Sequence, residues 1–343
     1  MNKQLIKVLK YVGGIGLGAL LLYFAFKGAS LETIGEQLKN ANLSWVLLSI
    51  GIGLFSHYVR ALRWRMQFKA SGYNPPLPNV FSSTMFMYLT NLAFPRAGEI
   101  ARCTALLRSD KIPIATSIGT VIVERVFDVM VLFLLVLLAF GLESATIYGY
   151  INEALSSFSG VSSGATLLFA AGGVLVVIGA LFWVFRKKIL ASSLFQKVME
   201  FAKKLWDSAI SIRKIEKPGL FIAYTFIIWL FYWLMTYVVF FSLPDFQELD
   251  LSFVYFSLLV TIIGAFGYAL PVPGGIGPYH AAVIFTFIAF QVHPDPEVSG
   301  NLGRTFAIII HSSHLILQFV GGALGYLYLV SRKPQDSAMV PSN

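Results

Sequence analysis

The chain has 343 residues, of which 57% are hydrophobic and 13% are charged, and its mean hydropathy is +0.73. Soluble domains contain roughly 25% charged residues, so this composition excludes an ordinary soluble core. The formal net charge of +9 does not indicate a nucleic-acid partner, because the Lys and Arg residues flank apolar runs. Cys103 is the single cysteine, which excludes an internal disulfide framework and a cysteine-based metal site.

Apolar runs long enough for a helix to cross roughly 30 Å of hydrocarbon recur along the chain. The first run follows three lysines and looks like a signal peptide, but it lacks a convincing cleavage site, so we interpret it as a retained span. The sequence therefore predicts an all-α polytopic membrane protein with six full spans, at Tyr11–Phe26, Trp45–Leu62, Ile112–Phe140, Gly164–Phe185, Leu220–Leu243 and Arg304–Val330.

Two further apolar stretches, Asn79–Pro95 and Leu251–Gln291, are broken by proline and glycine. Under the positive-inside rule, the basic N-terminus and the basic segment 186–217 lie in the cytoplasm, as does the C-terminus. The segment 96–111 is also basic, so Asn79–Pro95 is expected to enter and leave the membrane on the cytoplasmic side as a re-entrant hairpin. For Leu251–Gln291 a hairpin and two full crossings both remain open.

The two halves of the chain repeat one pattern, which is two spans, a broken stretch and one long span. Since they begin on opposite sides of the membrane, the pattern predicts an inverted repeat, in which substrate binds where the two broken elements meet. We expect a single membrane domain, 1–343, made of halves 1–163 and 164–333 and a short tail, 334–343. The segment 186–217 reads as an amphipathic helix on the anionic inner leaflet or as a docked connecting helix.

Ionisable residues inside the predicted spans are costly and mark functional sites. Glu124, Arg125 and Asp128 lie together in one span, unless they form only its interfacial end. At the first break, Pro95 and Gly98 end one half-helix, and the next one begins near Glu99 with free N–H groups that attract an anion. Arg96 and Arg102 add cations suited to phosphate, although Glu99 and Arg102 could instead form a structural ion pair. The candidate substrate-binding residues in the first half of the chain are Arg63, Asn91, Arg96, Gly98, Glu99, Arg102, Glu124, Arg125 and Asp128.

The second break contains three glycines in four residues, Gly274, Gly275 and Gly277, which allow close approach of a ligand or of another backbone. In the last span Arg304 and His311 share one face with Gln318, which is expected to face the protein interior. We expect no metal and no cofactor, because no acidic third ligand lies near the histidines. No catalytic triad order, Walker loop or dinucleotide fingerprint occurs.

Several motifs together resemble the lysylphosphatidylglycerol synthase transmembrane or flippase-like family. They are Arg60-Ala-Leu-Arg63-Trp64, Asn91 with Pro95-Arg-Ala-Gly98-Glu99 and Arg102, Glu124-Arg125 with Asp128, and Pro273-Gly-Gly-Ile-Gly277. The resemblance covers almost the whole chain and implies a bacterial inner-membrane protein that corresponds to the flippase portion without the soluble aminoacyl-transferase domain. One departure is His280, at a position where many relatives carry an acidic residue, which leaves room for an anionic substrate.

These observations predict a lipid translocase, a flippase-like transporter that moves the headgroup of a phospholipid or a polyprenyl-phosphate lipid through a polar cavity between the broken hairpins. The rival interpretations are a membrane-embedded transferase, with an acidic residue as general base, and a noncatalytic membrane scaffold. We expect membrane lipid as the partner and no nucleic acid. Whether the chain forms a homo-oligomer is left open by the sequence.

Overall fold

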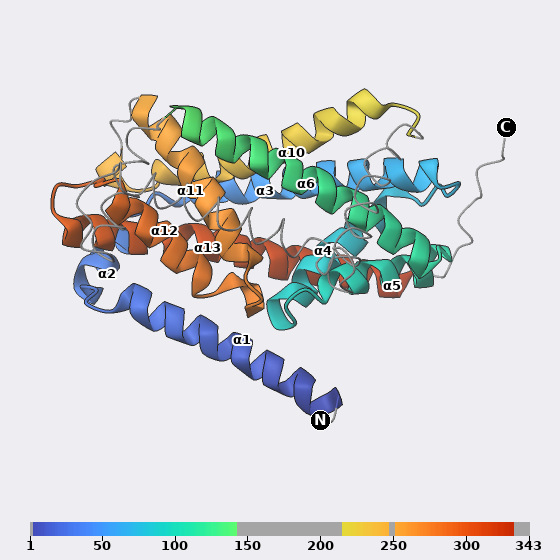
Figure 1. Ribbon diagram of the computed structural model, residues 1–343, viewed down its shortest axis with the longest axis horizontal. Helices are drawn as coiled ribbons and strands as arrows, with labels where there is room; N and C mark the ends of the chain where they lie inside the picture. Colours follow the sequence, from blue (N-terminus) through green and yellow to red (C-terminus); the bar gives the residue numbers. More distant parts are fainter. Residues whose placement is uncertain (1–2, 143–214, 247–250, 333–343) are drawn as a thin grey trace, which may run out of the picture. The chain divides into compact units, whose positions relative to one another are not determined.

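The computed structural model describes residues 3–142, 215–246 and 251–332. All regular structure in these ranges is helical, which confirms the predicted all-α class (Figure 1). The predicted span Gly164–Phe185, most of the segment 186–217 and the tail 334–343 lie outside the described residues. The elements are α1 (Lys3–Phe26), α2 (Leu31–Asn40), α3 (Leu43–Ala70), α4 (Leu77–Ala93), α5 (Gly98–Asp110), α6 (Ile114–Leu142), α10 (Pro218–Phe240), η2 (Pro244–Phe246), α11 (Leu251–Ala269), η3 (Pro273–Gly275), α12 (Pro278–Ala289) and α13 (Pro296–Ser331).

The chain divides into two compact units, Met1–Phe133 with Arg213–Asn343, and Leu134–Ile212. The described part of the second unit is the C-terminal end of α6. All the packing and contacts that follow belong to the first unit. The inverted-repeat halves 1–163 and 164–333 stay a prediction.

Three described helices, α3, α10 and α13, are individually long and apolar enough to cross a membrane. The apolar part of α1 and the helix α2 pass the same test as a pair that is bent by 91°. The described chain therefore has three or four candidate spans, and the count of six stays a prediction. The sequence did not predict α2. This helix starts after Ser30, whose side chain caps it by accepting a hydrogen bond from the Thr33 N–H.

Two apolar cores hold the helices of the first unit together. One core joins α1, α10, α11, α12 and α13, and at its centre the rings of Phe240 and Phe306 lie 4.1 Å apart. The other joins α3, α4, α5 and α6 around Trp64 and Phe68, whose side chains are fully buried. The extensive contacts of α13 with α4, and of α10 with α3, connect the early and late helices.

The two Pro/Gly breaks lie where predicted and contact each other. The first separates α4 from α5, and the second separates α11 from α12 around the short helix η3. Arg96 adopts a left-handed backbone conformation (φ 63°), and its guanidinium donates a hydrogen bond of 2.7 Å to the Ala269 carbonyl at the end of α11. The helix α4 also packs against η3. The predicted meeting of the broken elements is therefore present within the first unit.

Candidate functional site: a buried ion network

Seven charged side chains from three helices form a continuous ion network in the first unit. Its members are Arg60 and Arg63 from α3, Glu99 and Arg102 from α5, and Glu124, Arg125 and Asp128 from α6. Four arginines and three carboxylates leave an excess of one positive charge (4 − 3 = 1). The charges of α6 therefore pair with residues of two other helices, α3 and α5.

The centre of the network is closed to solvent. Arg63 Nη2 lies 3.3 Å from Glu124 Oε1, and Arg102 Nη2 lies 2.6 Å from Glu124 Oε2, with all three side chains fully buried. Arg63 Nη1 also donates to Asp128 Oδ1 at 2.9 Å. Glu124 thus bridges α3 and α5, and its two oxygens are both used by guanidinium donors.

Helical spacing and aromatic side chains position these charges. Arg60 and Arg63 lie one turn apart on α3, so both point toward the same face of α6. The guanidinium carbon of Arg102 lies 4.2 Å from the ring centroid of Trp64, a cation–π contact. Arg60 also donates to the hydroxyl of Tyr232 on α10 at 2.7 Å. The aromatic side chains replace the water that these cations lose on burial.

One edge of the network is partly exposed. The Arg125 side chain is 48% exposed and pairs with Glu99, whose side chain is 27% exposed. Glu99 has a second partner, because its Oε2 lies 2.7 Å from Arg102 Nη2. Further inside, Arg102 Nε and Nη1 are buried and have no hydrogen-bond partner among the described residues. The edge therefore offers an accessible cation backed by unused donors.

The first break contributes to this site by placing α5, which carries Glu99 and Arg102. It does not contribute through free N–H groups at the start of α5. Asn91 Oδ1 accepts the Gly98 N–H at 2.9 Å, so one of the donors expected to bind an anion is already occupied. Arg96 contacts Ala269 and is not brought together with Arg102. Of the cations predicted at this break, Arg102 alone joins the ion network.

A Gly98→Ala substitution is expected to destabilise the first break. The added Cβ would lie 2.2 Å from the Met87 carbonyl oxygen and 2.7 Å from Asn91 Oδ1, so α4 and α5 would have to separate. Overpacking of this kind costs about 1–3 kcal/mol. Thermal unfolding in detergent measures the loss, and unchanged stability would show that the two helices can separate without cost.

The second break and Arg304 serve packing around α1. The Gly277 Cα lies against the backbone of Gly18, where any Cβ would collide with the Gly18 carbonyl oxygen. Arg304 donates to the carbonyls of Ala25 at 2.9 Å and Lys27 at 3.2 Å, which satisfies the end of α1. Gly274 lies between α4 and α13, and Gly275 lies against the ring of Tyr268. None of these four residues joins the ion network.

His280 and His311 belong to a second buried cluster, on α12 and α13. The His311 side chain is buried, as predicted for the polar face of the last span. The rings of His280 and His311 lie 4.7 Å apart. Within the described ranges no group of three or more His, Cys, Asp or Glu side chains is arranged to hold a metal ion.

Sequence reasoning missed several polar partners. Arg60 was part of a recognised motif but was not assigned to the site, although its i,i+3 spacing from Arg63 was a usable signal. Tyr232 and Thr225 come from α10, and nothing local predicts that they face α3. Asp110, at the end of α5, accepts hydrogen bonds from Asn79 and Ser109. Burial raises the pKa of the Asp110 carboxyl, while these two hydrogen bonds act in the opposite direction.

The fold and the ion network define an α-helical multi-pass membrane protein with a charge cluster among its helices. The chain belongs to the family described as the lysylphosphatidylglycerol synthase TM region, whose model matches residues 11–322. It is similar to a UPF0104 membrane protein of Methanocaldococcus jannaschii, with 24% identity over 302 residues that cover 82% of this chain and 85% of that protein. No solved structure matches the chain. The resemblance inferred from the motifs is confirmed.

Proposed function

We propose that the chain is a lipid translocase that moves the headgroup of a phospholipid or a polyprenyl-phosphate lipid across the membrane. The observation that carries the proposal is the excess of one positive charge in a buried ion network with a partly exposed edge. An ionisable group at membrane depth costs at least about 2.5–3.5 kcal/mol, so a network with an unbalanced cation favours an anionic ligand. A lipid phosphate supplies that anion, while the acyl or prenyl chains remain in hydrocarbon.

The exchange of partners at the edge gives the phosphate a route of binding. The phosphate approaches Arg125 and competes with Glu99 for its guanidinium. Glu99, when displaced, keeps its second partner Arg102, so no carboxylate is left unpaired. The fully buried pairs of Glu124 with Arg63 and Arg102 keep the helices in place during the exchange.

The same edge suits a headgroup that also carries an ammonium group. Glu99 is the most exposed of the three carboxylates in the network, so it is the one that a lysyl-modified headgroup would reach. The carboxylates Glu124 and Asp128 are held by guanidinium donors, which occupy the oxygens that a general base would use. This arrangement favours translocation over general-base chemistry in a transferase.

The proposal includes a topology. The chain resides in the bacterial cytoplasmic membrane, as the family resemblance implies. Both termini lie in the cytoplasm, which the distribution of Lys and Arg supports. The halves form an inverted repeat, for which the contact between the two breaks is the supporting observation. The basic segment 186–217 binds the anionic inner leaflet through its charges.

The proposal is tested with fluorescent lipids in proteoliposomes. Arg125→Gln removes a charge-assisted hydrogen bond worth about 1.5–3 kcal/mol, which predicts a roughly tenfold to hundredfold slower movement of anionic lipids. Glu99→Gln leaves Arg125 paired only with Asp128, at 3.6 Å, so it should preserve movement of anionic lipid and impair movement of lysyl-modified lipid. The matched control is Arg108→Gln, because Arg108 is exposed on α5 and outside the network.

Two outcomes would overturn the proposal. If Arg125→Gln moves anionic lipid at the wild-type rate, the ion network does not take part in lipid movement. If the folded wild type moves no phospholipid and no polyprenyl phosphate, the remaining interpretations are a transferase and a noncatalytic scaffold. Covalently altered lipid recovered with the protein would then identify a transferase.

A further inference from the structure

A second polar cluster is buried where α11, α12 and α13 meet. The hydroxyl of Tyr268 lies 3.1 Å from Nδ1 of His311 and 3.1 Å from Nδ1 of His314. The His311 ring is further enclosed by Tyr279, at 5.1 Å between centroids, and by His280, at 4.7 Å. His311 is 1% exposed and His280 is 8% exposed. The helix packing alone does not require three imidazoles at one place.

The shared tyrosine hydroxyl links the protonation of two histidines. Tyr268 has one hydrogen, so it donates to one imidazole and accepts from the N–H of the other. His311 and His314 therefore adopt opposite tautomers when both are neutral. Nε2 of each ring, and Nδ1 of His280, are buried without a hydrogen-bond partner among the described residues. The cluster thus has lone pairs that can accept a proton, and repulsion between neighbouring imidazoliums limits it to one.

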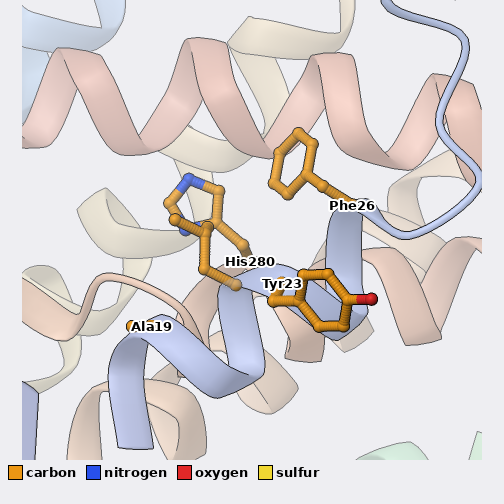
Figure 2. Close-up of a pocket in the computed structure, with 5 residues that line it drawn as sticks. Ala19, Tyr23, Phe26 and His280 are labelled. Carbon is orange, nitrogen blue, oxygen red and sulfur yellow. The ribbon is translucent and has the colours of Figure 1, made fainter. Parts of the chain in front are cut away.

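A groove connects His280 to the surface of the first unit. It has a volume of about 570 Å³ and is lined by Ala19, Leu22, Tyr23, Phe26 and His280. Figure 2 shows the Tyr23 hydroxyl pointing away from the imidazole, which leaves His280 as the ionisable group turned into the groove. Phe26 is the last residue of α1, and the chain turns by 91° before α2. The groove therefore lies beside the last two turns of α1 and gives His280 an opening to the surface of the first unit.

Polar side chains also connect the cluster to the ion network. The ring of His57 on α3 lies 4.2 Å from the ring of Tyr88 on α4. On the side of the network, Arg60 donates a hydrogen bond of 2.7 Å to the Tyr232 hydroxyl. His57 and Arg60 lie three residues apart on α3, so they are neighbours on one side of that helix. A proton added to the histidines therefore raises the positive potential on the side of the arginines.

The ionisable side chains around the cluster come from six helices. They are Tyr23 of α1, His57 and Arg60 of α3, Tyr88 of α4, Tyr268 of α11, Tyr279 and His280 of α12, and His311 and His314 of α13. Arg60 is the charged member of this set. Its charge opposes protonation of the histidines until an anion binds at the network, which makes proton binding and anion binding favour each other.

We propose that His280, His311 and His314, linked by the Tyr268 hydroxyl, form a proton-binding site that couples the binding of one proton to the movement of an anionic lipid. In the coupling step a proton adds to an imidazole lone pair. The same proton is later released on the other side of the membrane, and no other bond forms or breaks. The inference rests on the proposed translocase function, and it assigns the energy source to a proton gradient with proton and lipid moving in the same direction.

The test uses proteoliposomes that contain a fluorescent anionic phospholipid, with a pH difference across the membrane and the membrane potential clamped. With one proton carried per lipid, the lipid should accumulate in the leaflet on the less acidic side, up to about tenfold per pH unit. His311→Gln should abolish this accumulation but retain exchange of lipid between leaflets without a gradient. Tyr268→Phe, which keeps all three histidines, should change the pH dependence. The matched control is His293→Gln, because His293 is exposed in the loop before α13.

The outcomes separate this inference from the proposed function. Equal lipid distributions with and without the pH difference would overturn proton coupling and leave the translocase intact. Accumulation by His311→Gln at the wild-type level would remove the cluster from the coupling. If the wild type moves no lipid under any gradient, the translocase and the proton coupling fall together.

Discussion

Glu124→Gln is expected to unfold or strongly destabilise the protein, by about 3–5 kcal/mol. Glu124 is fully buried and holds Arg63 and Arg102 at 3.3 and 2.6 Å. The neutral amide removes one of three negative charges while four arginines remain, so the excess positive charge doubles from one to two. The loss is measured by thermal or denaturant unfolding of the purified protein in detergent.

The matched control is Glu99→Gln, the same chemical change at the exposed edge of the same network. One partner of Glu99, Arg125, is about half exposed and can be solvated when the ion pair is lost. The other partner, Arg102, keeps its ion pair with Glu124 at 2.6 Å. A partly exposed pair contributes about 1 kcal/mol or less, so this variant should stay folded. Equal destabilisation by the two substitutions would contradict the distinction between a closed centre and an open edge.

Gly277→Ala is expected to displace α1 and to destabilise the second break. Gly277 has φ +96°, a conformation that alanine adopts only with strain of about 1–3 kcal/mol. Its Cβ would also collide with the backbone of Gly18, which adds an overpacking cost of about 1–3 kcal/mol. Because the collision is with backbone, the helix α1 must move away. Limited proteolysis of α1 and thermal unfolding measure the two effects.

Gly219→Ala provides the control for this substitution. Gly219 lies in the first turn of α10, and a Cβ there meets no atom within 4 Å. Alanine at such a site is expected to be neutral or slightly stabilising, because it restricts the unfolded chain. If limited proteolysis cleaves α1 at the same rate in Gly277→Ala and in Gly219→Ala, the close approach of the Gly18 and Gly277 backbones is not required to hold α1 in place.

The sequence predicted helices and breaks because these depend on local chemistry. The apolar runs predicted α1, α3, α10 and α13, and the proline and glycine positions predicted the interruptions after α4 and α11. It missed α2, a short helix of low hydrophobicity that begins at a Ser30 cap. The six-span count needs segments that the structure does not describe.

The sequence also located the charges and raised the Glu99–Arg102 ion pair at i,i+3, which the structure contains. It could not pair charges that lie on different helices. Glu124, Arg125 and Asp128 were predicted as a costly group within an apolar run. Arg102 was predicted as a cation of the first break, and Arg63 as part of a family motif. Which cation meets which carboxylate depends on the packing of α3, α5 and α6, so the fully buried bridge at Glu124 emerged from the structure alone. The same packing turns Arg96 and Arg304 toward backbone carbonyls and away from the network.

By itself, the sequence determined the membrane environment, the helical class, the positions of the two breaks and the family, since each depends on composition or on residues close together in the chain. The tertiary structure decided which charges are neutralised, which edge is exposed and which glycines serve packing. The physical reason is that a buried charge or a missing Cβ has a consequence only through the atoms of another helix, often more than a hundred residues away along the chain.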